Sequence, residues 1–172
     1  MVAVVVIEFS SMRCQPLRRA LCVARGKGME VQLKIGSDPL FAESLTKTNM
    51  ASYYLSRGII WDHNQFLNSW EELENYETHL DQTRVGVLRF SYRGETTFLR
   101  DFQLLPEFQG KGVGTKCLDL VVGHALSRQS TKLVLRVFSE NPAISLYESK
   151  GFVRTSEVKG LVEMETLLSS NT

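Results

Sequence analysis

The sequence predicts a single α/β domain with a mixed central sheet of about seven strands flanked by about four helices. Three observations predict this fold class. Apolar runs with strand or helix patterning alternate along the chain, no internal repeat or low-complexity tract interrupts them, and the length suits one core. The chain has 172 residues, of which 43% are hydrophobic, so it can bury one core of ordinary size.

The first 28 residues lack the regular patterning of the rest. One apolar run covers residues 2–7, and the basic residues that follow have no helical or strand period. We therefore expect residues 1–28 to be an extension that the protein can lose without effect, and residues 29–172 to form the domain. An organellar transit peptide is the alternative interpretation of the basic bias, and a signal peptide fits poorly because no basic residue precedes the apolar run.

Composition excludes several classes of function. Lys and Arg number 20 against 19 Asp and Glu, so a net charge of +1 provides no general attraction for nucleic acid or an anionic membrane. No apolar run reaches the length of about 18 residues that a spanning helix needs. The three cysteines form no C-x-x-C pair and the three histidines are scattered, which argues against a disulfide framework and against a metal site. We expect a cytoplasmic protein.

The first half of the patterned region predicts one strand and two helices. Residues 30–36 alternate apolar and polar side chains, as a half-buried strand does. Asp38 and Pro39 are typical of a helix start, and the helix is expected to continue to residue 55 and stop at Gly58. Asp62 and Gln65 resemble a capping box. A helical stripe follows them, made of Phe66, Leu67, Trp70 and Leu73.

The second half predicts the remaining strands and helices. In order, they are a hairpin of residues 84–92 and 96–105, a helix that begins near 113, a strand over 132–138, a helix from 141 to 150, and strands over 152–157 and 161–167. A glycine-rich stretch at 110–114 opens the first of these helices. It is the strongest functional signal in the chain.

This stretch can form an anion site. Glycines in a strand-to-helix turn let several backbone N–H groups point into one concavity, and a helix N-terminus adds roughly half a positive charge. A diphosphate would be stabilised there, with Lys111 and Lys116 adding charge. The alternative is a tight turn that needs glycine for its dihedral angles and binds nothing. The residues concerned are Gln109, Gly110, Lys111, Gly112, Val113 and Gly114.

The sequence of residues 109–114 does not match two other families of phosphate-binding loop. A Walker A loop requires Lys-Ser or Lys-Thr directly after its last glycine, whereas Thr115 and Lys116 follow Gly114. A dinucleotide fingerprint requires the spacing G-x-G-x-x-G and an acid at the end of the next strand. Here the glycines run G-x-G-x-G, and the next strand ends in Val137 and Phe138.

A third pattern, Q/R-x-x-G-x-G/A, is satisfied by Gln109, Gly112 and Gly114, and it resembles the acetyl-CoA motif of the GNAT superfamily of N-acetyltransferases. About thirty residues on, the stretch from Asn141 to 152 resembles the second signature of that family, N-x-x-A-x-x-L/F-Y-x-x-x-G-F. One residue fewer than in the signature separates Asn141 from the alanine, but the Ala, Leu-Tyr and Gly-Phe elements stand at the expected separations from one another. The resemblance covers residues 97–152 well and 29–167 in outline.

The resemblance implies direct attack of an amine on the thioester of acetyl-CoA within a ternary complex. It assigns the pantetheine arm to the backbone amides of Leu104 and Leu105 and to Asn141. It assigns the pyrophosphate to residues 109–114 together with Thr115. Tyr147 would be the general acid that protonates the departing sulfur, because a phenol with a pKa near 10 is protonated at neutral pH. The alternative for Tyr147 is a packed core residue.

The general base and the acceptor site are less defined by the resemblance. Asp101 is our candidate base, although it could instead form a surface salt bridge with Arg100 or Arg136, and Glu107 is expected to be a solvated turn residue. The acceptor side of this family is built from the first two helices and the last hairpin, here the turn at 156–160. Its candidate residues are Tyr53, Tyr54, Trp61, Asp62, His63, Phe66 and Trp70.

Of these candidates, Phe66 and Trp70 lie on the apolar stripe, so we expect them in the core. Trp61 and Asp62, in the connection between the two helices, are the expected acceptor-binding residues.

The predicted function is therefore transfer of an acetyl group from acetyl-CoA to an amine acceptor, with coenzyme A as the second product. The acceptor would be a small molecule or a peptide, and the sequence leaves a homodimer open. The alternative is a non-catalytic acyl-CoA-binding regulatory module that keeps the nucleotide loop, and the presence of Tyr147 favours the enzyme. A dinucleotide-dependent oxidoreductase is a distant third.

Overall fold

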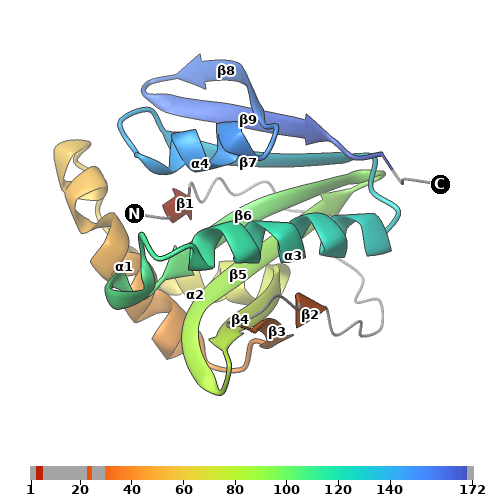
Figure 1. Ribbon diagram of the computed structural model, residues 1–172. Helices are drawn as coiled ribbons and strands as arrows, with labels where there is room; N and C mark the ends of the chain where they lie inside the picture. Colours follow the sequence, from red (N-terminus) through yellow and green to blue (C-terminus); the bar gives the residue numbers. More distant parts are fainter. Residues whose placement is uncertain (1–2, 6–22, 25–29, 170–172) are drawn as a thin grey trace.

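A nine-stranded mixed sheet forms the centre of the molecule (Figure 1). The computed structural model describes residues 3–5, 23–24 and 30–169. The strand order is β2-β3-β4-β5-β6-β7-β9-β8, and β1 pairs with β6 outside this path. The strands are β1 (Ala3–Val5), β2 (Val23–Ala24), β3 (Val31–Ile35), β4 (Glu74–Leu80), β5 (Thr83–Arg93), β6 (Thr96–Leu104), β7 (Lys132–Phe138), β8 (Val153–Val158) and β9 (Leu161–Leu167).

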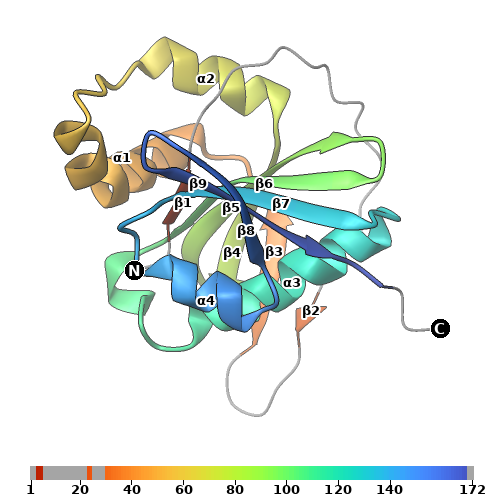
Figure 2. The same cartoon turned by 90° about the horizontal axis from the view of Figure 1, so that it is seen from above.

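Helices cover both faces of the sheet (Figure 2). The two N-terminal helices lie on one face and the two C-terminal helices on the other. They are α1 (Pro39–Ser56), α2 (His63–Glu72), α3 (Val113–Ser127) and α4 (Ala143–Ser149), with a 3-10 turn at Pro106–Phe108. Successive side chains of a strand point to opposite faces of the sheet, so β5 packs against the helices on both faces. Leu88 packs in the core under α3, whereas Val87 packs against Phe66 of α2.

Capping side chains begin the first two helices as expected. The Oδ1 atom of Asp38 accepts a hydrogen bond from the N–H of Phe41 at 2.9 Å, and Asp62 does the same for Gln65 at 2.9 Å. Each bond satisfies one of the amides that an α-helix leaves unpaired at its start. The Asp62 cap fixes where the connection between α1 and α2 ends, and Trp61 is the residue directly before this cap.

The strands β6 and β7 run in parallel and pair only over their first halves. The paired positions are Thr96–Leu99 with Lys132–Leu135. Beyond them β1 pairs with β6, in antiparallel register from Ala3 opposite Gln103 to Val5 opposite Asp101, and it also contacts β7. Figure 1 shows β1 between the separating ends of β6 and β7.

The seven strands from residue 31 onward and the four helices confirm the predicted fold class. Most predicted elements lie within a few residues of their observed bounds. Strand β4 was missed, because its sequence ENYETHL is too polar to show a two-residue hydrophobic period. It lies between β3 and β5, where the buried side chain of Glu77 accepts hydrogen bonds from the Ser37 amide and from Arg84.

The N-terminal segment was predicted to be a separate extension. Two short parts of it, β1 and β2, pair with the sheet, and the rest of residues 1–29 lies outside the described residues. The boundary after residue 28 stays a prediction. Among the described residues no helix is both long and apolar enough to span a membrane.

Candidate active site

The glycine-rich stretch forms an exposed loop that leads into α3. Gly110 and Gly112 have φ angles of 69° and 79°, in the left-handed region that favours glycine, and an added Cβ at either would meet nothing within 4 Å. Gly112 is the N-cap of α3, and no side chain caps this helix start. The first amides of α3 therefore have no side-chain cap, and the space beside the Cα atoms of Gly110 and Gly112 is open. This geometry suits a phosphate.

The other residues of the predicted loop lie around this opening. Lys111 is exposed, Val113 is buried in the core as the first residue of α3, and Gly114 is buried behind it. Thr115 is half-buried. The part of the loop that is open to a ligand is therefore the backbone around Gly110, Lys111 and Gly112.

The side chain of Gln109 points away from the phosphate position. Its Nε2 atom donates to the carbonyl oxygen of Leu104 at 2.8 Å, and Asn49 of α1 donates to the same oxygen at 2.9 Å. Gln109 thus ties the loop to the end of β6 and to α1. The predicted contact between Gln109 and the pyrophosphate stays a prediction.

The structure corrects the role predicted for Leu105. Its N–H donates to the carbonyl oxygen of Val85 on β5 at 2.8 Å, so this amide is not available to a pantetheine arm. Neighbouring residues in a strand direct their peptide groups to opposite sides. Leu104 therefore faces the other edge of β6, toward β7, and a contact between its amide and the pantetheine arm stays a prediction.

Tyr147 lies on α4 and is fully buried. Its ring packs against Phe152 with centroids 5.9 Å apart, and its hydroxyl has no hydrogen-bond partner within residues 3–5, 23–24 and 30–169. Burial, and secondarily the negative charge of Asp101, raises the pKa of this phenol well above its usual value. The hydroxyl therefore keeps its proton across the physiological range, and it is near enough to Asp101 to feel its charge.

Asn141 is buried just before α4. Its Oδ1 atom accepts from the N–H of Ala143 at 2.9 Å, and its carbonyl oxygen accepts from the N–H of Ile144 at 3.2 Å. These bonds hold the start of the helix that carries Tyr147. The predicted contact between Asn141 and the pantetheine arm stays a prediction.

Asp101 is buried, which contradicts the surface salt bridge with Arg100 or Arg136 that the sequence left open. It faces α1 and forms an ion pair with Arg89 of β5, with 3.4 Å between the Oδ2 and Nε atoms. Thr46 and Gln103 donate hydrogen bonds to its carboxylate at 3.1 and 2.9 Å. Burial raises the pKa of Asp101, while the guanidinium of Arg89 opposes that change.

Arg89 was not identified from the sequence. It is fully buried, donates from Nη2 to Ser69 at 3.1 Å, and stacks over the ring of Phe66 at 4.7 Å. In the described part of the chain its Nη1 atom has no hydrogen-bond partner. The available signal was a lone arginine within the apolar run at 85–90, since a charge at such a position requires a buried partner.

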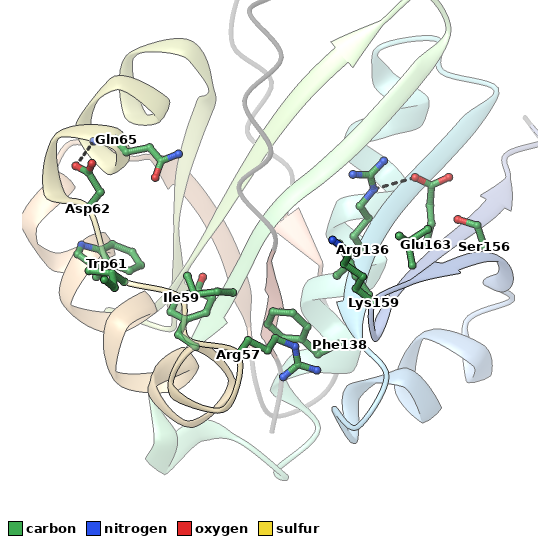
Figure 3. Close-up of a pocket in the computed structure, with 14 residues that line it drawn as sticks. Arg57, Ile59, Trp61, Asp62, Gln65, Arg136, Phe138, Ser156, Lys159 and Glu163 are labelled. Atoms are coloured by element: carbon green, nitrogen blue, oxygen red, sulfur yellow. Dashed lines mark hydrogen bonds and ion pairs between the residues drawn. The ribbon is translucent and has the colours of Figure 1, made fainter.

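A cavity of about 590 Å³ opens on the α1 and α2 side, between the connection of these helices and the β7-β9-β8 end of the sheet (Figure 3). Trp61 and Asp62 line it, as expected. The helix side also contributes Tyr54, Arg57, Ile59, Ile60 and Gln65. The sheet side contributes Arg136, Phe138, Ser156, Val158, Lys159, Leu161 and Glu163.

Two ion pairs brace the walls of this cavity. Arg57, at the end of α1, contacts both carboxylate oxygens of Glu140, at 2.6 and 2.7 Å, and its guanidinium stacks over Phe138 at 4.0 Å. Arg136 of β7 pairs with Glu163 of β9 at 2.9 Å. Neither Arg57 nor Glu163 was predicted to be a site residue. Their ion-pair partners are distant in the sequence and come close only in the folded chain.

The remaining aromatic candidates divide between core and cavity. Phe66 is fully buried and Trp70 packs beside it, as expected. Tyr53 stacks on Phe138 behind the cavity wall, with 5.6 Å between centroids. Trp61 donates from Nε1 to the buried carboxylate of Glu43 at 2.6 Å, and His63 contacts the same carboxylate at 2.9 Å.

Comparison with known proteins agrees with this geometry. A match to the acetyltransferase (GNAT) family spans residues 42–152, more than half of the chain. A thialysine N-ε-acetyltransferase from Bos taurus is 33% identical over 79 residues, and its counterpart from Mus musculus is 30% identical over the same length. Each match covers 44% of this chain and 46% of the relative, so the chain spans about half the length of the curated relatives it matches.

Solved structures share the fold at low identity. A spermidine N-acetyltransferase from Vibrio cholerae, solved with CoA and spermine, has a TM-score of 0.64 at 18% identity over 80% of this chain and 95% of its own. The PaiA N-acetyltransferase from Thermoplasma acidophilum, solved with coenzyme A, has a TM-score of 0.59 at 16% identity over 80% and 98%. With the family match over residues 42–152, the chain belongs to the acetyltransferase (GNAT) family.

Proposed function

We propose that the protein transfers an acetyl group from acetyl-CoA to an amine acceptor by direct attack within a ternary complex. The observation that carries the proposal is the hydroxyl of Tyr147, which is buried and has no hydrogen-bond partner among the described residues. Buried polar groups are nearly always bonded, so an unpaired one calls for an explanation. A leaving sulfur that needs a proton explains it.

The residues present fit acetyl-CoA. The backbone around Gly110, Lys111 and Gly112 would hold the pyrophosphate at the start of α3, where the space is open. The edge of β6 at Leu104 would pair with the pantetheine arm, near Asn141. When bound, the group supplies an acyl thioester, whose carbonyl carbon an amine can attack.

Two side chains would move protons. Tyr147 would donate its phenolic proton to the sulfur that leaves. Asp101 remains our proposed proton acceptor for the amine, but it does not line the cavity. Tyr54 does, and both burial and the charge of Asp101 raise its pKa.

The cavity between α1, α2 and the end of the sheet would hold the acceptor. Its volume suits a small molecule or a terminal side chain of a peptide. The two mammalian relatives are named for acetylation of thialysine at its ε-nitrogen. We therefore propose a primary amine at the end of an aliphatic chain as the acceptor.

The deciding experiment measures release of thiol from acetyl-CoA with a panel of primary amines. We expect amine-dependent release by the full chain, and a thermal shift with coenzyme A but none with a nicotinamide dinucleotide. A protein that binds coenzyme A and turns over none of the amines would support the regulatory module instead.

The loop gives a second test through Gly112→Val. A Cβ at this position would enter the space before α3, and a β-branched residue at a φ of 79° would displace the backbone donors. We expect the dissociation constant of acetyl-CoA to rise at least tenfold, or about 1.4 kcal/mol. Isothermal titration calorimetry measures it.

Gly94→Val is the matched control for this variant. Gly94 lies in the β5-β6 turn with a φ of 55° and equally open space, so it carries a comparable backbone strain away from the loop. Both variants should lose similar stability. Equal acetyl-CoA affinity of Gly112→Val and Gly94→Val would show that the loop is not part of the cofactor site.

Removal of residues 1–28 tests the N-terminal segment. From the sequence we expected no effect on acetyl-CoA affinity or on the melting temperature. The pairing of β1 with Asp101–Gln103 changes this expectation, since β1 and a pantetheine arm would use the same edge of β6. We now expect affinity to rise by about threefold or more, because apparent affinity scales with the fraction of molecules in which the edge is open.

The same truncation should lower the melting temperature by a few degrees, since the pairings of β1 and β2 are lost. Calorimetry and a thermal melt of the two lengths of chain measure both effects. An unchanged affinity would show that β1 does not compete with the cofactor.

A further inference from the structure

The charged side chains that line the acceptor cavity leave little for a second charge on the acceptor. The lining has two arginines, and each forms an ion pair within the protein, one of them with Glu163. The other charged lining residues, Asp62 and Lys159, are exposed, so water screens them. Cationic side chains of the lining outnumber its carboxylates by three to two. Among the described lining residues, a second ammonium group would therefore find no buried carboxylate left unpaired.

Trp61 lines the cavity but uses its polar atom elsewhere. Its Nε1 atom donates to the buried carboxylate of Glu43 at 2.6 Å, and an indole has no other polar atom. Trp61 therefore offers a ligand only the apolar surface of its ring. His63 contacts the same carboxylate at 2.9 Å, so two side chains hold the end of the connection between α1 and α2 against α1.

Tyr54 and Phe138 add two further rings to the lining. The ring centroid of Tyr54 is 6.0 Å from that of Trp61 and 6.4 Å from that of Phe138. One aromatic surface therefore runs from the helix side of the cavity to the sheet side, and Figure 3 shows Trp61 and Phe138 on it. Aromatic rings contact one another favourably in offset or edge-on arrangements. This surface suits a ligand that carries an aromatic group.

The apolar lining continues onto the exposed surface on both sides of the cavity. Ile59 and Ile60, in the connection between α1 and α2, are 45% and 90% exposed, and Val158 of β8 is 64% exposed. Among the described residues eight large hydrophobic side chains are exposed, and these three are the ones that line the cavity. Exposed apolar side chains that gather at a cavity indicate a surface that a ligand covers. The surface that an acceptor would bury is therefore apolar from the rings to the outer edge.

We propose that the acceptor is a primary amine whose non-reacting end is apolar and uncharged, with an aromatic ring as the preferred group. This inference rests on the proposed acetyl transfer. The ring lies against Tyr54, Trp61 and Phe138, and Ile60 covers its outer side. Contact with the acceptor removes the apolar surface of these side chains from water, which favours binding. These residues then set specificity and take no part in the chemical step.

Hexylamine and cadaverine provide a matched pair of acceptors. They have the same length and differ in one group, a methyl in hexylamine and a second ammonium in cadaverine. With the full chain and saturating acetyl-CoA, we expect kcat/KM per reactive amine to be about tenfold higher for hexylamine, because an ammonium on an apolar surface loses hydration without gaining a partner. 2-Phenylethylamine should be used at least as well as hexylamine, and L-lysine as poorly as cadaverine. Thiol release gives the rates, and mass spectrometry identifies the acetylated products.

Two variants of Ile60 assign this preference to the apolar edge of the cavity. Ile60→Ser should lower the ratio of kcat/KM for 2-phenylethylamine to that for cadaverine by about fivefold, since the lost side chain no longer covers the ring. Ile60→Glu should lower it further, because it offers the second ammonium of cadaverine a carboxylate. Leu55 is 83% exposed on α1 and does not line the cavity, so Leu55→Ser and Leu55→Glu are matched controls that should leave the ratio unchanged. A thermal melt checks that all four variants fold.

The outcomes distinguish this inference from the proposed function. If the wild type uses cadaverine or L-lysine as well as hexylamine and 2-phenylethylamine, the apolar end is wrong while acetyl transfer stands. The same conclusion follows if the ratio does not respond to the Ile60 variants, or if the chain acetylates other amines of the panel but neither hexylamine nor 2-phenylethylamine. A chain that binds acetyl-CoA but acetylates no amine, or that does not bind it, would remove the proposed function itself.

Discussion

Tyr147→Phe should reduce turnover by about 10²- to 10⁴-fold, the usual range for loss of a general acid, with little change in acetyl-CoA affinity. The substitution keeps the ring against Phe152 and removes only a hydroxyl that bonds to none of the residues that the structure describes. Stability should therefore be unchanged or should rise slightly, because an unsatisfied buried polar group is removed. Steady-state kinetics with any accepted amine and a thermal melt measure the two effects.

Tyr92→Phe is the matched control. The Tyr92 hydroxyl lies 2.7 Å from Nε2 of His124, far along β5 from the loop and in contact with α3. Its loss should lower stability by about 1 kcal/mol and leave turnover intact, the opposite of the result expected for Tyr147→Phe. Turnover of Tyr147→Phe within threefold of the wild type would mean that another group protonates the sulfur.

Asp101→Asn should lower the free energy of unfolding by about 3–5 kcal/mol, because it leaves the buried guanidinium of Arg89 without a counter-charge. Thr46 and Gln103 donate to different carboxylate oxygens and asparagine has one, so the loss includes one of these hydrogen bonds as well as the charge. Denaturant titration measures it. A loss of activity in this single variant would therefore not identify Asp101 as the base.

The double variant Arg89→Met with Asp101→Asn separates stability from chemistry. Removing both charges should recover most of the lost stability, since replacing a buried ion pair with less polar residues is often neutral. If Asp101 accepts the proton of the amine, the recovered protein will still be inactive near neutral pH. If the double variant is active, Asp101 serves only to balance Arg89.

The sequence predicted those parts of the fold that local patterns determine. Strand β7 and strand β9 were predicted with the bounds that the structure has, and Asp38 and Asp62 begin their helices as expected. Each of these features depends on neighbours within a few residues. Strand β4 has no such local pattern, because most of its side chains are polar. Those that are buried, such as Glu77, are hydrogen-bonded to residues far away in the sequence, which a local pattern does not reveal.

The site divides in the same way. The loop and Tyr147 could be located from two motifs, because their spacing along the chain sets their positions on one turn and one helix. The partner of Asp101 could not be located, since Arg89 is opposite it only through the register of β5 and β6. The cavity wall at Lys159 required the whole sheet to form.

Arg57 contacts three segments of the chain: the end of α1, the residues before α4, and the β8-β9 turn. It ends α1, pairs with Glu140 directly before the helix that carries Tyr147, and an added Cβ at Gly160 in the β8-β9 turn would come within 3.2 Å of its Nη2 atom. A shift of either wall around an acceptor would therefore be passed to α4. Linkage requires such coupling to be reciprocal. Occupancy of the acceptor site would thus change the dissociation constant of acetyl-CoA by the same factor as acetyl-CoA changes that of the acceptor, so the two substrates would not bind independently.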